Sequence, residues 1–473
     1  MDIVGLLPYA SGFIIVATAV VVSCHAVLRK RDSRAAVAWV GLILLAPVVG
    51  IVLYGLFGIN RVRRRAATER AGRPRLPSAA RHECTAGELE RALPEGARHL
   101  AALHNLAGSM VHRVLLSGNR IDPLFGGVAA YGEMLRAIDA STASVSLSTF
   151  IFDDDEAGGR FANALDAARR RGVEVRVLID AIGGRYSWPP MHRHLRRRGL
   201  TVARFMPALF RSGYANLRNH RKILVADGRV GFTGGMNIRD AHLSEEIRDV
   251  HFSLRGPVVA HLQEVFAEDW AYSTGEILSG ERWFPLLDAA GATRARGLAD
   301  GPDEDFETMR WTFLGALSVA RRSVRVVTPY FLPDAALLSA LGVAGRRGVQ
   351  VEVVLPERNN QALVAWACMA QLWQILAHGC RVYMSPPPFD HTKMFLVDGA
   401  WALIGSSNWD PRSLRLNFEF DVECYDADLA CQMEARVDAL IAASRRVTLS
   451  EVDGRPMPIR LRDSLARLMA PYL

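Results

Sequence analysis

Cysteine is scarce in this sequence, with six residues among 473. They are Cys24, Cys84, Cys368, Cys380, Cys424 and Cys431. No two of them have a CxxC spacing, and none is paired with a nearby histidine in the manner of metal ligands. We therefore expect no metal centre and no cofactor. Most of the cysteines lie in apolar stretches, which is typical of small core residues in a reducing compartment.

Charged residues are missing from two long stretches near the N-terminus. One runs from Ile3 to Cys24, and the other runs from Ala35 to Asn60 and is closed by "RVRRR". Each is long enough to cross a hydrocarbon layer of about 30 Å. A cleaved signal peptide is an alternative for the first stretch. However, its start carries no positive charge, it is too long, and a second run follows at once. We expect a hydrophobic helical hairpin over residues 1–65.

The orientation of this hairpin is less clear from the charges. Four basic residues lie in "RKRDSR" between the two stretches, and seven arginines lie between Arg61 and Arg75. The positive-inside rule then favours a cytoplasmic C-terminal body. If both stretches span, the basic linker is on the wrong side. A re-entrant or shallow hairpin, helped by Pro8 and Pro47, would remove the conflict, so a multi-pass and a hairpin anchor both remain possible.

The body of the chain contains a repeated strand, helix, strand pattern. In the first copy the three segments are 144–153, 158–171 and 173–180; in the second they are 323–334, 335–347 and 349–356. Short connections between such segments are the signature of a parallel βαβ unit. The repeat predicts an α/β fold of two tandem lobes, 110–290 and 291–473, with mixed or parallel sheets flanked by helices. Residues 66–109 are expected to be a linker, from 66 to about 93, followed by a lead-in helix at roughly 95–109.

A doubled motif gives this repeat its chemistry. "NHRKILVADGRVGFTGGMN" contains His220, Lys222 and Asp227, and "DHTKMFLVDGAWALIGSSN" contains His391, Lys393 and Asp398. These six residues, in two copies of HxKxxxxD, are the candidate catalytic set. In a strand, residues i and i+2 point to the same face, so each histidine should project with its lysine. The odd spacing of the aspartates suggests that they pin the following turn.

Two such lobes, related by a pseudo-twofold axis, would bring two histidines to one phosphorus. One imidazole can attack as nucleophile while the other moves protons to and from the oxygens, giving a phosphohistidine intermediate. The lysines would stabilise charge on the phosphoryl oxygens, so that no metal is needed. The small-residue turns that follow bring Asn237 and Asn408 back as further phosphate donors.

Each histidine is followed by a carboxylate at nearly equal spacing. Asp249 lies 29 residues after His220, and Glu419 lies 28 residues after His391. An imidazole nucleophile needs an acceptor to orient its second nitrogen. Asp249 and Glu419 are therefore the candidate orienting carboxylates.

The doubled motif resembles that of the phospholipase D superfamily, and longer stretches resemble bacterial cardiolipin synthases. These are "AWVGLILLAPVVGIVLYGLFGINRVRRR", "RDVHFSLRGPVVAHLQEVFAEDW", "TPYFLPD" and "SSNWDPRSLRLNFEF". The resemblance implies transfer of a phosphatidyl group from one phosphatidylglycerol to the hydroxyl of a second lipid. It implies His220 as nucleophile, His391 as acid and base, and a head-group pocket shaped by Arg412, Ser413 and Asn417. It also implies a bacterial inner membrane location.

The net charge of +8 suits an anionic partner. Arginines are interleaved with Trp188, Phe205, Phe210 and Tyr214 before the first motif, as in a lipid-binding rim. We expect an anionic phospholipid membrane as partner and no nucleic acid. A lipid hydrolase, a nuclease of the same superfamily and an inactive scaffold are the rival interpretations. The acceptor lipid and the oligomeric state remain open, although one chain holds both halves of the site.

Overall fold

The computed structural model describes residues 3–30, 33–58, 80–206, 217–244, 246–302 and 306–470. The described residues fall into two compact units, which we treat separately. The N-terminal unit contains residues 3–58. The second unit contains the described residues from 80 to 470 and includes both copies of the HxKxxxxD motif.

The N-terminal unit is helical throughout. Its elements are α1 (Ile3–Arg29), α2 (Ser33–Leu45), α3 (Pro47–Leu53) and the π-helix η1 (Tyr54–Gly58). Within the described chain, the segment Ser11–Arg29 of α1 is the one helix long and apolar enough to cross a membrane. The second apolar stretch, for which a span and a shallow hairpin both remained possible, is not one continuous helix. Its helix is interrupted at Ala46, because Pro47 cannot continue the helical hydrogen bonds.

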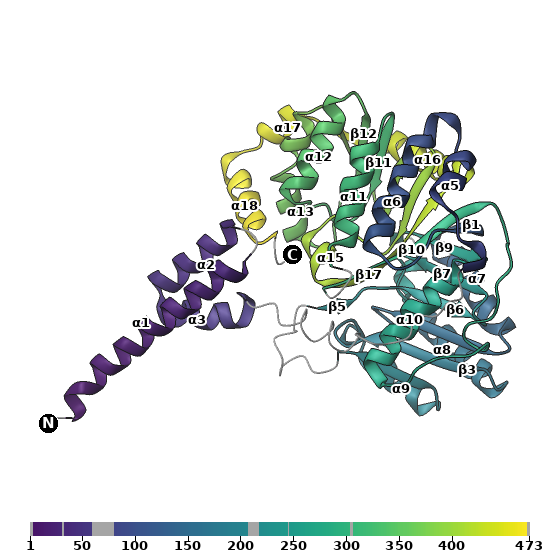
Figure 1. Ribbon diagram of the computed structural model, residues 1–473, viewed down its shortest axis with the longest axis horizontal. Coiled ribbons are helices and arrows are strands. Elements are labelled where there is room, and N and C mark those ends of the chain that lie inside the picture. The colour runs from purple at the N-terminus through teal and green to yellow at the C-terminus, as the bar shows by residue number, and fades with distance from the viewer. Residues whose placement is uncertain are drawn as a thin grey trace. The chain divides into compact units, whose positions relative to one another are not determined.

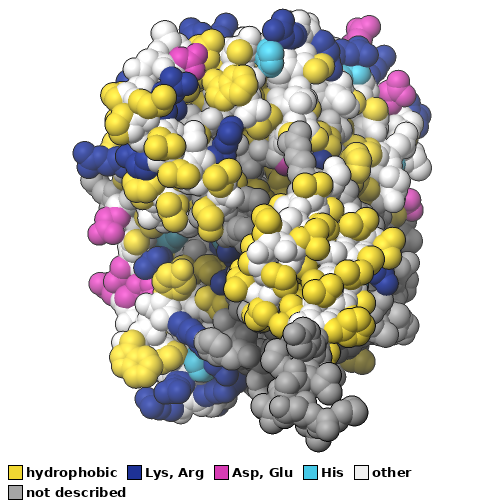
Figure 2. Space-filling view, turned by 90° about the vertical axis from the view of Figure 1, so that its left-hand side faces the viewer, with side chains coloured by type: hydrophobic (Ala, Val, Ile, Leu, Met, Phe, Trp, Pro, Cys, Tyr) yellow, Lys and Arg dark blue, Asp and Glu magenta, His cyan; other side chains and the backbone are white. Residues whose placement is uncertain are grey.

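The helices of this unit pack through small and aromatic residues. Ala26 and Ile43 are fully buried, and Tyr54 is nearly so. The Tyr54 hydroxyl lies 2.8 Å from His25 Nδ1, linking the end of the unit to α1. Large apolar side chains such as Phe13 and Leu45 remain exposed, and hydrophobic side chains cover the outer surface of the hairpin (Figure 2). An outward apolar surface of this kind suits a lipid environment.

The second unit is built on one long mixed sheet of sixteen strands (Figure 1). Fifteen of them follow the order β18-β13-β12-β11-β15-β16-β17-β10-β1-β9-β7-β6-β2-β3-β4, and β5 pairs with β17 beside this path. In the first repeat the strands are β1 (Leu116–Phe125), β2 (Ser144–Thr149), β3 (Glu174–Asp180), β4 (Thr201–Phe205), β5 (Arg218–Asn219), β6 (Ile223–Ala226), β7 (Val230–Gly234), β8 (Ile247–Arg248) and β9 (Val250–Arg255). In the second they are β10 (Thr293–Asp300), β11 (Ser323–Val327), β12 (Gln350–Pro356), β13 (Arg381–Ser385), β14 (Phe389–Asp390), β15 (Met394–Val397), β16 (Trp401–Gly405), β17 (Asn417–Tyr425) and β18 (Arg445–Val447).

The strand order confirms the mixed α/β fold and its internal repeat. β2, β3 and β4 are parallel neighbours in one repeat, and β11, β12 and β13 are parallel neighbours in the other. The antiparallel strands β6, β7 and β9 correspond in order to β15, β16 and β17. β1 and β10 pair antiparallel at the centre, so the pseudo-twofold axis passes between them.

Helices cover both faces of this sheet (Figure 1). Those of the first repeat are α7 (Gly126–Ala140), α8 (Glu156–Arg170), α9 (Met191–Arg197) and α10 (Val259–Thr274). Those of the second are α11 (Thr308–Val319), α12 (Ala335–Arg346), α13 (Ala362–Met369), α14 (Trp373–Leu376), α15 (Pro411–Arg415), α16 (Ala427–Ala442), α17 (Leu449–Asp453) and α18 (Met457–Leu468). One core cluster takes residues from both repeats, including Leu262 of α10 and Phe420 of β17. The two lobes therefore share a hydrophobic core.

The lead-in segment is more ordered than its composition suggests. After the short η2 (Ala80–His82), α5 (Ala86–Ala92) begins with a capping box between Thr85 and Glu88 and buries Leu89. η3 (Glu95–Leu100) and α6 (Ala101–Met110) follow as the expected lead-in helix. The expected linker was thus wrong for 80–93, and its remaining residues, 66–79, lie outside the described chain.

Candidate active site

Both histidines lie where the chain changes partners between the two repeats. β5 pairs with β17 of the second repeat, and the His220 N–H donates to the Phe418 carbonyl at 2.9 Å. β14 pairs in the same way with β8 of the first repeat, and the His391 N–H donates to the Arg248 carbonyl at 2.7 Å. The HxK segments were expected inside single strands, but each lies between two short strands. The short strand before each histidine pairs with the other repeat. The strand after each lysine pairs with strands of its own repeat.

The two histidines line one cavity of about 370 Å³ that takes residues from both repeats. Asn237, Asn408, Arg412 and Asn417, all predicted from the sequence, line it as well. Lys222 and Lys393 are buried beside the histidines, and each Nζ donates to the carbonyl of its own histidine, at 2.7 and 2.6 Å. The lysine Nζ of the second motif also lies 3.0 and 3.1 Å from the two ring nitrogens of His391. Each histidine and lysine therefore lie together, as expected.

The orienting carboxylates are crossed between the repeats. His220 Nδ1 lies 2.9 Å from Glu419 Oε2, and His391 Nδ1 lies 2.9 Å from Asp249 Oδ2. Their sequence spacing suggested that each carboxylate follows and serves the histidine of its own repeat, and this pairing was wrong. The strand exchange places each histidine beside the strand that leads to the carboxylate of the other repeat. Each half of the site is thus completed by the other.

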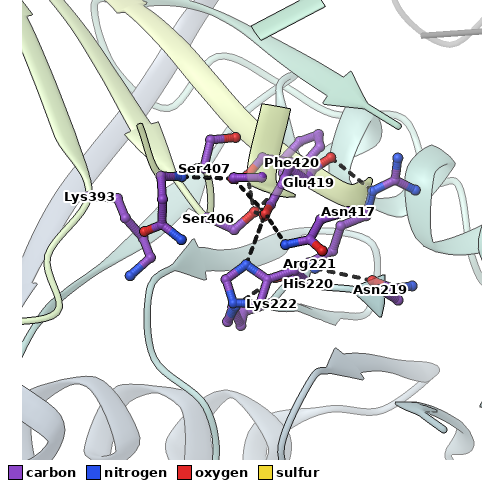
Figure 3. Close-up of polar contacts among 12 residues, drawn as sticks. Asn219, His220, Arg221, Lys222, Lys393, Ser406, Ser407, Asn417, Glu419 and Phe420 are labelled. Carbon is purple, nitrogen blue, oxygen red and sulfur yellow. Dashed lines mark hydrogen bonds and ion pairs between the residues drawn. The ribbon is translucent and has the colours of Figure 1, made fainter. Parts of the chain in front are cut away.

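Glu419 is held by a set of side-chain donors that converge on its carboxylate (Figure 3). Besides His220, the Ser406 hydroxyl donates to Oε2 at 2.6 Å, and the Ser413 hydroxyl donates to Oε1 at 2.7 Å. The Asn417 side-chain amide donates to Oε1 at 3.0 Å. Neutral donors of this kind stabilise the charged carboxylate. Ser413 was expected in the pocket wall, but it is fully buried and acts on Glu419 instead.

Asp249 has no equivalent set of donors among the described residues. The positions that match Ser406, Ser413 and Asn417 in the first repeat are Gly235, His242 and Ile247. A Cβ on Gly235 would lie 2.6 Å from both Asp249 carboxylate oxygens, so a serine there would force the Asp249 side chain to shift. His242 Nε2 accepts from the Asn237 N–H at 3.3 Å, and the Asp249 carboxylate accepts from the Val250 N–H and His391. The two halves therefore differ in how firmly they hold a carboxylate charge.

The sequence matches two protein-family models. A family model described as "Cardiolipin synthase, PLD-like domain" matches residues 134–270 and 313–441. Together these ranges cover more than half of the chain. The chain belongs to this family of phospholipase D-like domains. A second model, "Phospholipase_D-nuclease N-terminal", matches residues 12–58.

Members of this family are similar to the chain over nearly its full length. Cardiolipin synthase A of Pseudomonas aeruginosa is 34% identical, with 96% of this chain and 94% of the relative covered. The major cardiolipin synthase ClsA of Bacillus subtilis is 30% identical, with coverage of 94% and 95%. Among solved structures, the phosphatidylserine synthase of Haemophilus influenzae has a TM-score of 0.63 at 14% identity. The match covers 80% of this chain and 100% of the phosphatidylserine synthase. At this low identity it supports the fold alone.

The two carboxylates of this phospholipase D-like site differ in acidity. Burial disfavours the charge of Glu419, but His220, Lys222 and Ser406 outweigh it and lower the pKa of Glu419 to about 2. Burial raises the pKa of Asp249 to about 6, against the opposing charge of Lys393. At neutral pH the Glu419 carboxylate is firmly ionised, while that of Asp249 is close to its titration range.

The basic side chains are also shifted by burial. It lowers the pKa of His220 to about 4, although Glu419 opposes the shift. Burial and the two lysines hold the pKa of His391 well below its usual range. Burial lowers the pKa of Lys222 to about 7 and of Lys393 to about 8, against the nearby carboxylates. Both imidazoles are therefore neutral at pH 7, and His220 can give its Nδ1–H to Glu419 and keep a free Nε2 lone pair.

The motif aspartates lie away from the cavity lining. Asp227 accepts from the N–H groups of the three residues that lead into β2, at 2.7 to 2.9 Å. Asp398 does the same before β11, at 2.7 to 2.8 Å, and also bonds His99 Nε2 at 2.7 Å. Both have a positive φ, near 52°. They hold the motif strand against the strand beside it, whereas the odd spacing suggested that they pin the following turn, and they do not line the cavity.

Several residues of the cavity wall were not singled out from the sequence. They are Phe150, Ile151, Tyr186, Arg218, Arg239, His242, Ile247, Tyr330, Asn360, Gln361, Val364, Phe389 and Asp410. Repeat alignment gives a signal for some, since Arg239 and Asp410 each follow the turn asparagine by two residues. Of the expected aromatic rim, Trp188 is exposed but Phe205 is core, and Phe210 and Tyr214 lie outside the described chain.

Within the described residues, no cluster of histidine, cysteine or carboxylate side chains could hold a metal ion. All six cysteines are free of disulfides. Cys84, Cys368, Cys380 and Cys424 are buried as expected, whereas Cys24 and Cys431 are exposed. The two buried lysines are the cationic side chains that contact the motif histidines directly. They are two of only three lysines in the chain, the third being Lys30.

Proposed function

We propose that the protein is a cardiolipin synthase, which transfers a phosphatidyl group between two phosphatidylglycerol molecules to give cardiolipin and glycerol. The observation that carries the proposal is the pair of crossed dyads, His220 with Glu419 and His391 with Asp249, lining one cavity. Two imidazoles beside buried lysines suit double displacement at a phosphodiester. The names of relatives that share nearly the full chain support the choice of lipid.

In the first step, His220 Nε2 attacks the phosphorus of one phosphatidylglycerol. The bond from phosphorus to the head-group oxygen breaks. The His391 and Asp249 pair, which takes up a proton when the anionic substrate binds, gives that proton through His391 to the leaving glycerol oxygen, and a phosphatidyl-histidine remains. In the second step, His391 takes the proton of a primary hydroxyl on another phosphatidylglycerol. That oxygen attacks phosphorus, the nitrogen to phosphorus bond breaks, and cardiolipin leaves.

The difference between the two halves supports this division of roles. Glu419 stays ionised because Ser406, Ser413 and Asn417 donate to it, so it can stabilise the positive charge that His220 gains on attack. The pKa of Asp249 near 6 lets the Asp249 and His391 pair gain or lose a proton at modest cost. A group that moves protons in both directions works best with a pKa near the operating pH.

Substrate binding should be coupled to proton uptake. The pKa values of about 7 and 8 for Lys222 and Lys393 are those of the empty cavity. An anionic phosphodiester favours the charged form and raises both values. The measurement uses a phosphonate analogue whose head group cannot leave. Calorimetry of its binding, in buffers of different ionisation enthalpy, should show proton uptake at about pH 8 and little proton uptake at about pH 6.

Lysine variants make the proton measurement specific. Lys222→Gln should remove up to one proton of the uptake, while Lys30→Arg should leave it unchanged, because Lys30 lies in the N-terminal unit. Equal uptake in wild type and Lys222→Gln would contradict the assignment of Lys222 to the phosphate.

The product formed from phosphatidylglycerol tests the function. The purified full chain in phosphatidylglycerol micelles, without added metal, should release glycerol and form a four-chain diphosphatidyl lipid. Phosphatidic acid as the only product would refute the synthase and leave a hydrolase. Phosphatidylethanolamine offered alongside shows the co-substrate, since its use would release ethanolamine. Activity lost to a chelator and restored by a divalent ion would contradict catalysis by lysine and histidine alone.

We further propose that the protein acts at the bacterial inner membrane, with the catalytic unit cytoplasmic and α1 as an anchor. The apolar length of α1 and the basic residues after the hairpin support this location. An anionic lipid surface rather than a nucleic acid is the proposed partner.

A further inference from the structure

The last helix, α18, exposes its apolar side and buries its polar side. Met457, Leu461, Leu465 and Leu468 follow one another at helical spacings of four, four and three, and are 75%, 59%, 55% and 70% exposed. We call these four residues the α18 stripe. The opposite side of the helix carries Asp463, which is 1% exposed. A helix that merely covers a soluble core has the reverse arrangement.

Ionic contacts keep α18 in this orientation. The Asp463 carboxylate pairs with Arg455 and with Arg462. The Arg462 guanidinium also lies 4.4 Å from the centre of the Trp366 ring on α13, and Arg455 donates to the Met369 carbonyl at 3.1 Å. Rolling the helix to bury the stripe would expose a buried ion pair and break these contacts. The exposure of the stripe is thus built into the packing of α18 on α13.

Positive charge lies on both sides of the stripe. Arg460 and Arg467 are exposed, and the Arg462 side chain is 45% exposed. The one carboxylate of α18, Asp463, is buried and paired. An apolar stripe between arginines matches a surface of anionic lipid, with chains for the stripe and head groups for the guanidiniums.

The helix under α18 connects this surface to the catalytic cavity. α13 packs against α18, and its Val364 lines the cavity together with Asn360 and Gln361 just before it. At another part of the cavity wall, Tyr186 is 65% exposed, and nearby in the chain Trp188 is 86% exposed. α13 therefore links the surface that carries α18 to the wall of the cavity.

We propose that α18 is an interfacial helix that lies in the plane of an anionic bilayer and holds the catalytic cavity against the lipid head groups. This contact is additional to the anchor provided by the N-terminal hairpin. Only the identity of the substrate lipid rests on the proposed function. Docking itself requires no turnover and can be measured apart from it.

Collision measurements on a nitroxide label test the proposal in the full chain. Cys24→Ser and Cys431→Ser remove the exposed thiols, and Leu465→Cys then places a label on the stripe. Val128→Cys is the matched control, because Val128 is an exposed apolar residue, 74% accessible, on α7. In vesicles containing phosphatidylglycerol, the label at 465 should become less accessible to a water-soluble nickel chelate and more accessible to oxygen. The label at 128 should not change.

The possible outcomes distinguish lipid from protein as the partner that contacts the α18 stripe. Equal accessibility at 465 and 128 would overturn the proposal. Loss of access to both nickel and oxygen at 465 would also overturn it, since it means that the N-terminal hairpin or a second copy of the chain covers the stripe. Arg460→Gln with Arg467→Gln should weaken docking roughly 25-fold, because each basic residue near an anionic surface contributes roughly fivefold. Equal docking on phosphatidylglycerol and phosphatidylcholine vesicles would exclude the role of these arginines.

Activity gives a second readout. Leu461→Glu with Leu465→Glu should raise KM for phosphatidylglycerol in vesicles and leave kcat on a dissolved short-chain phosphatidylglycerol unchanged, whereas Val128→Glu should alter neither. Loss of activity on both substrates would mean that the fold is damaged and would refute docking as the cause. If wild type makes no cardiolipin, the proposed function fails, while the label still reports docking.

Discussion

Replacing His220 with alanine should lower phosphatidyl transfer by at least about 10⁴-fold and abolish the phosphoenzyme, because it removes the proposed nucleophile. The measurement is acid-quenched trapping of radiolabelled phosphatidylglycerol on the protein, followed by peptide mapping. His194→Ala is the control, because this histidine of α9 does not line the cavity. Label trapped on His391 in the wild-type protein would reverse the two roles.

Loss of the second histidine should have a different signature. His391→Ala should lower turnover by about 10²–10⁴-fold, the usual contribution of a general acid and base. A phosphatidyl ester with a p-nitrophenol leaving group needs no proton on departure, so this variant should still release nitrophenol in a burst. The phosphoenzyme should then accumulate, since nothing deprotonates the acceptor alcohol. A His391→Ala variant that shows no burst would contradict the division of labour.

The sequence alone predicts much of this fold, because its strongest signals are local. Segments such as 173–180 alternate or cluster apolar residues between helical stretches, and the structure has strands or helices at each of the six places named in advance. The repeated strand, helix, strand pattern and the doubled motif then relate the two lobes without any knowledge of contacts. Segment 80–93 was misjudged because its composition resembles a linker, whereas a capping box and a few buried leucines are enough to order α5.

The crossing of the dyads could not be predicted from spacing. Asp249 and Glu419 follow the histidines of their own repeats at nearly equal distances along the chain, and this spacing is compatible with both the crossed and the uncrossed arrangement. What decides between them is the short pairing of β5 with β17 and of β8 with β14. Two-residue strands carry almost no signal in a sequence. The residues of the dyads were thus predictable, but their partners were not.

The asymmetry between the halves was visible in the sequence but needed the structure to be interpreted. Aligning "GGMN" with "GSSN" shows a glycine opposite Ser406, and nothing in the letters says that this serine faces a carboxylate. In the structure, Asp249 occupies the space that a Cβ on Gly235 would need. The chain has only three lysines, and two of them are the motif residues Lys222 and Lys393. Apart from Lys30, arginine is used at every other position that carries a lysine or arginine. A small, strongly buried ammonium whose pKa can fall to about 7 is something that arginine does not supply.

Exchanging the carboxylates for amides should separate the crossed dyads from uncrossed ones. Glu419→Gln should lower turnover by about 10³–10⁴-fold, as in other triads that lose the orienting carboxylate, and should prevent phosphoenzyme formation as His220→Ala does. Asp249→Asn should instead reproduce His391→Ala, with a phosphoenzyme that forms and accumulates. Asp421→Asn is the matched control, because this buried carboxylate on the same strand bonds Ser407 rather than a histidine.

Double variants make the argument quantitative, because residues that act as one unit are not additive. Glu419→Gln should cost little more once His220 is already alanine, while its effect should be retained in the His391→Ala background. Asp249→Asn should show the opposite dependence. The contrary result would be that Glu419→Gln does not lower turnover further in the His391→Ala background and lowers it by its full factor in the His220→Ala background. Each carboxylate would then serve the histidine of its own repeat, and the crossed geometry would not operate in catalysis. Since His220 Nδ1 lies within 3.1 Å of both Glu419 oxygens, the two residues should behave as a single unit.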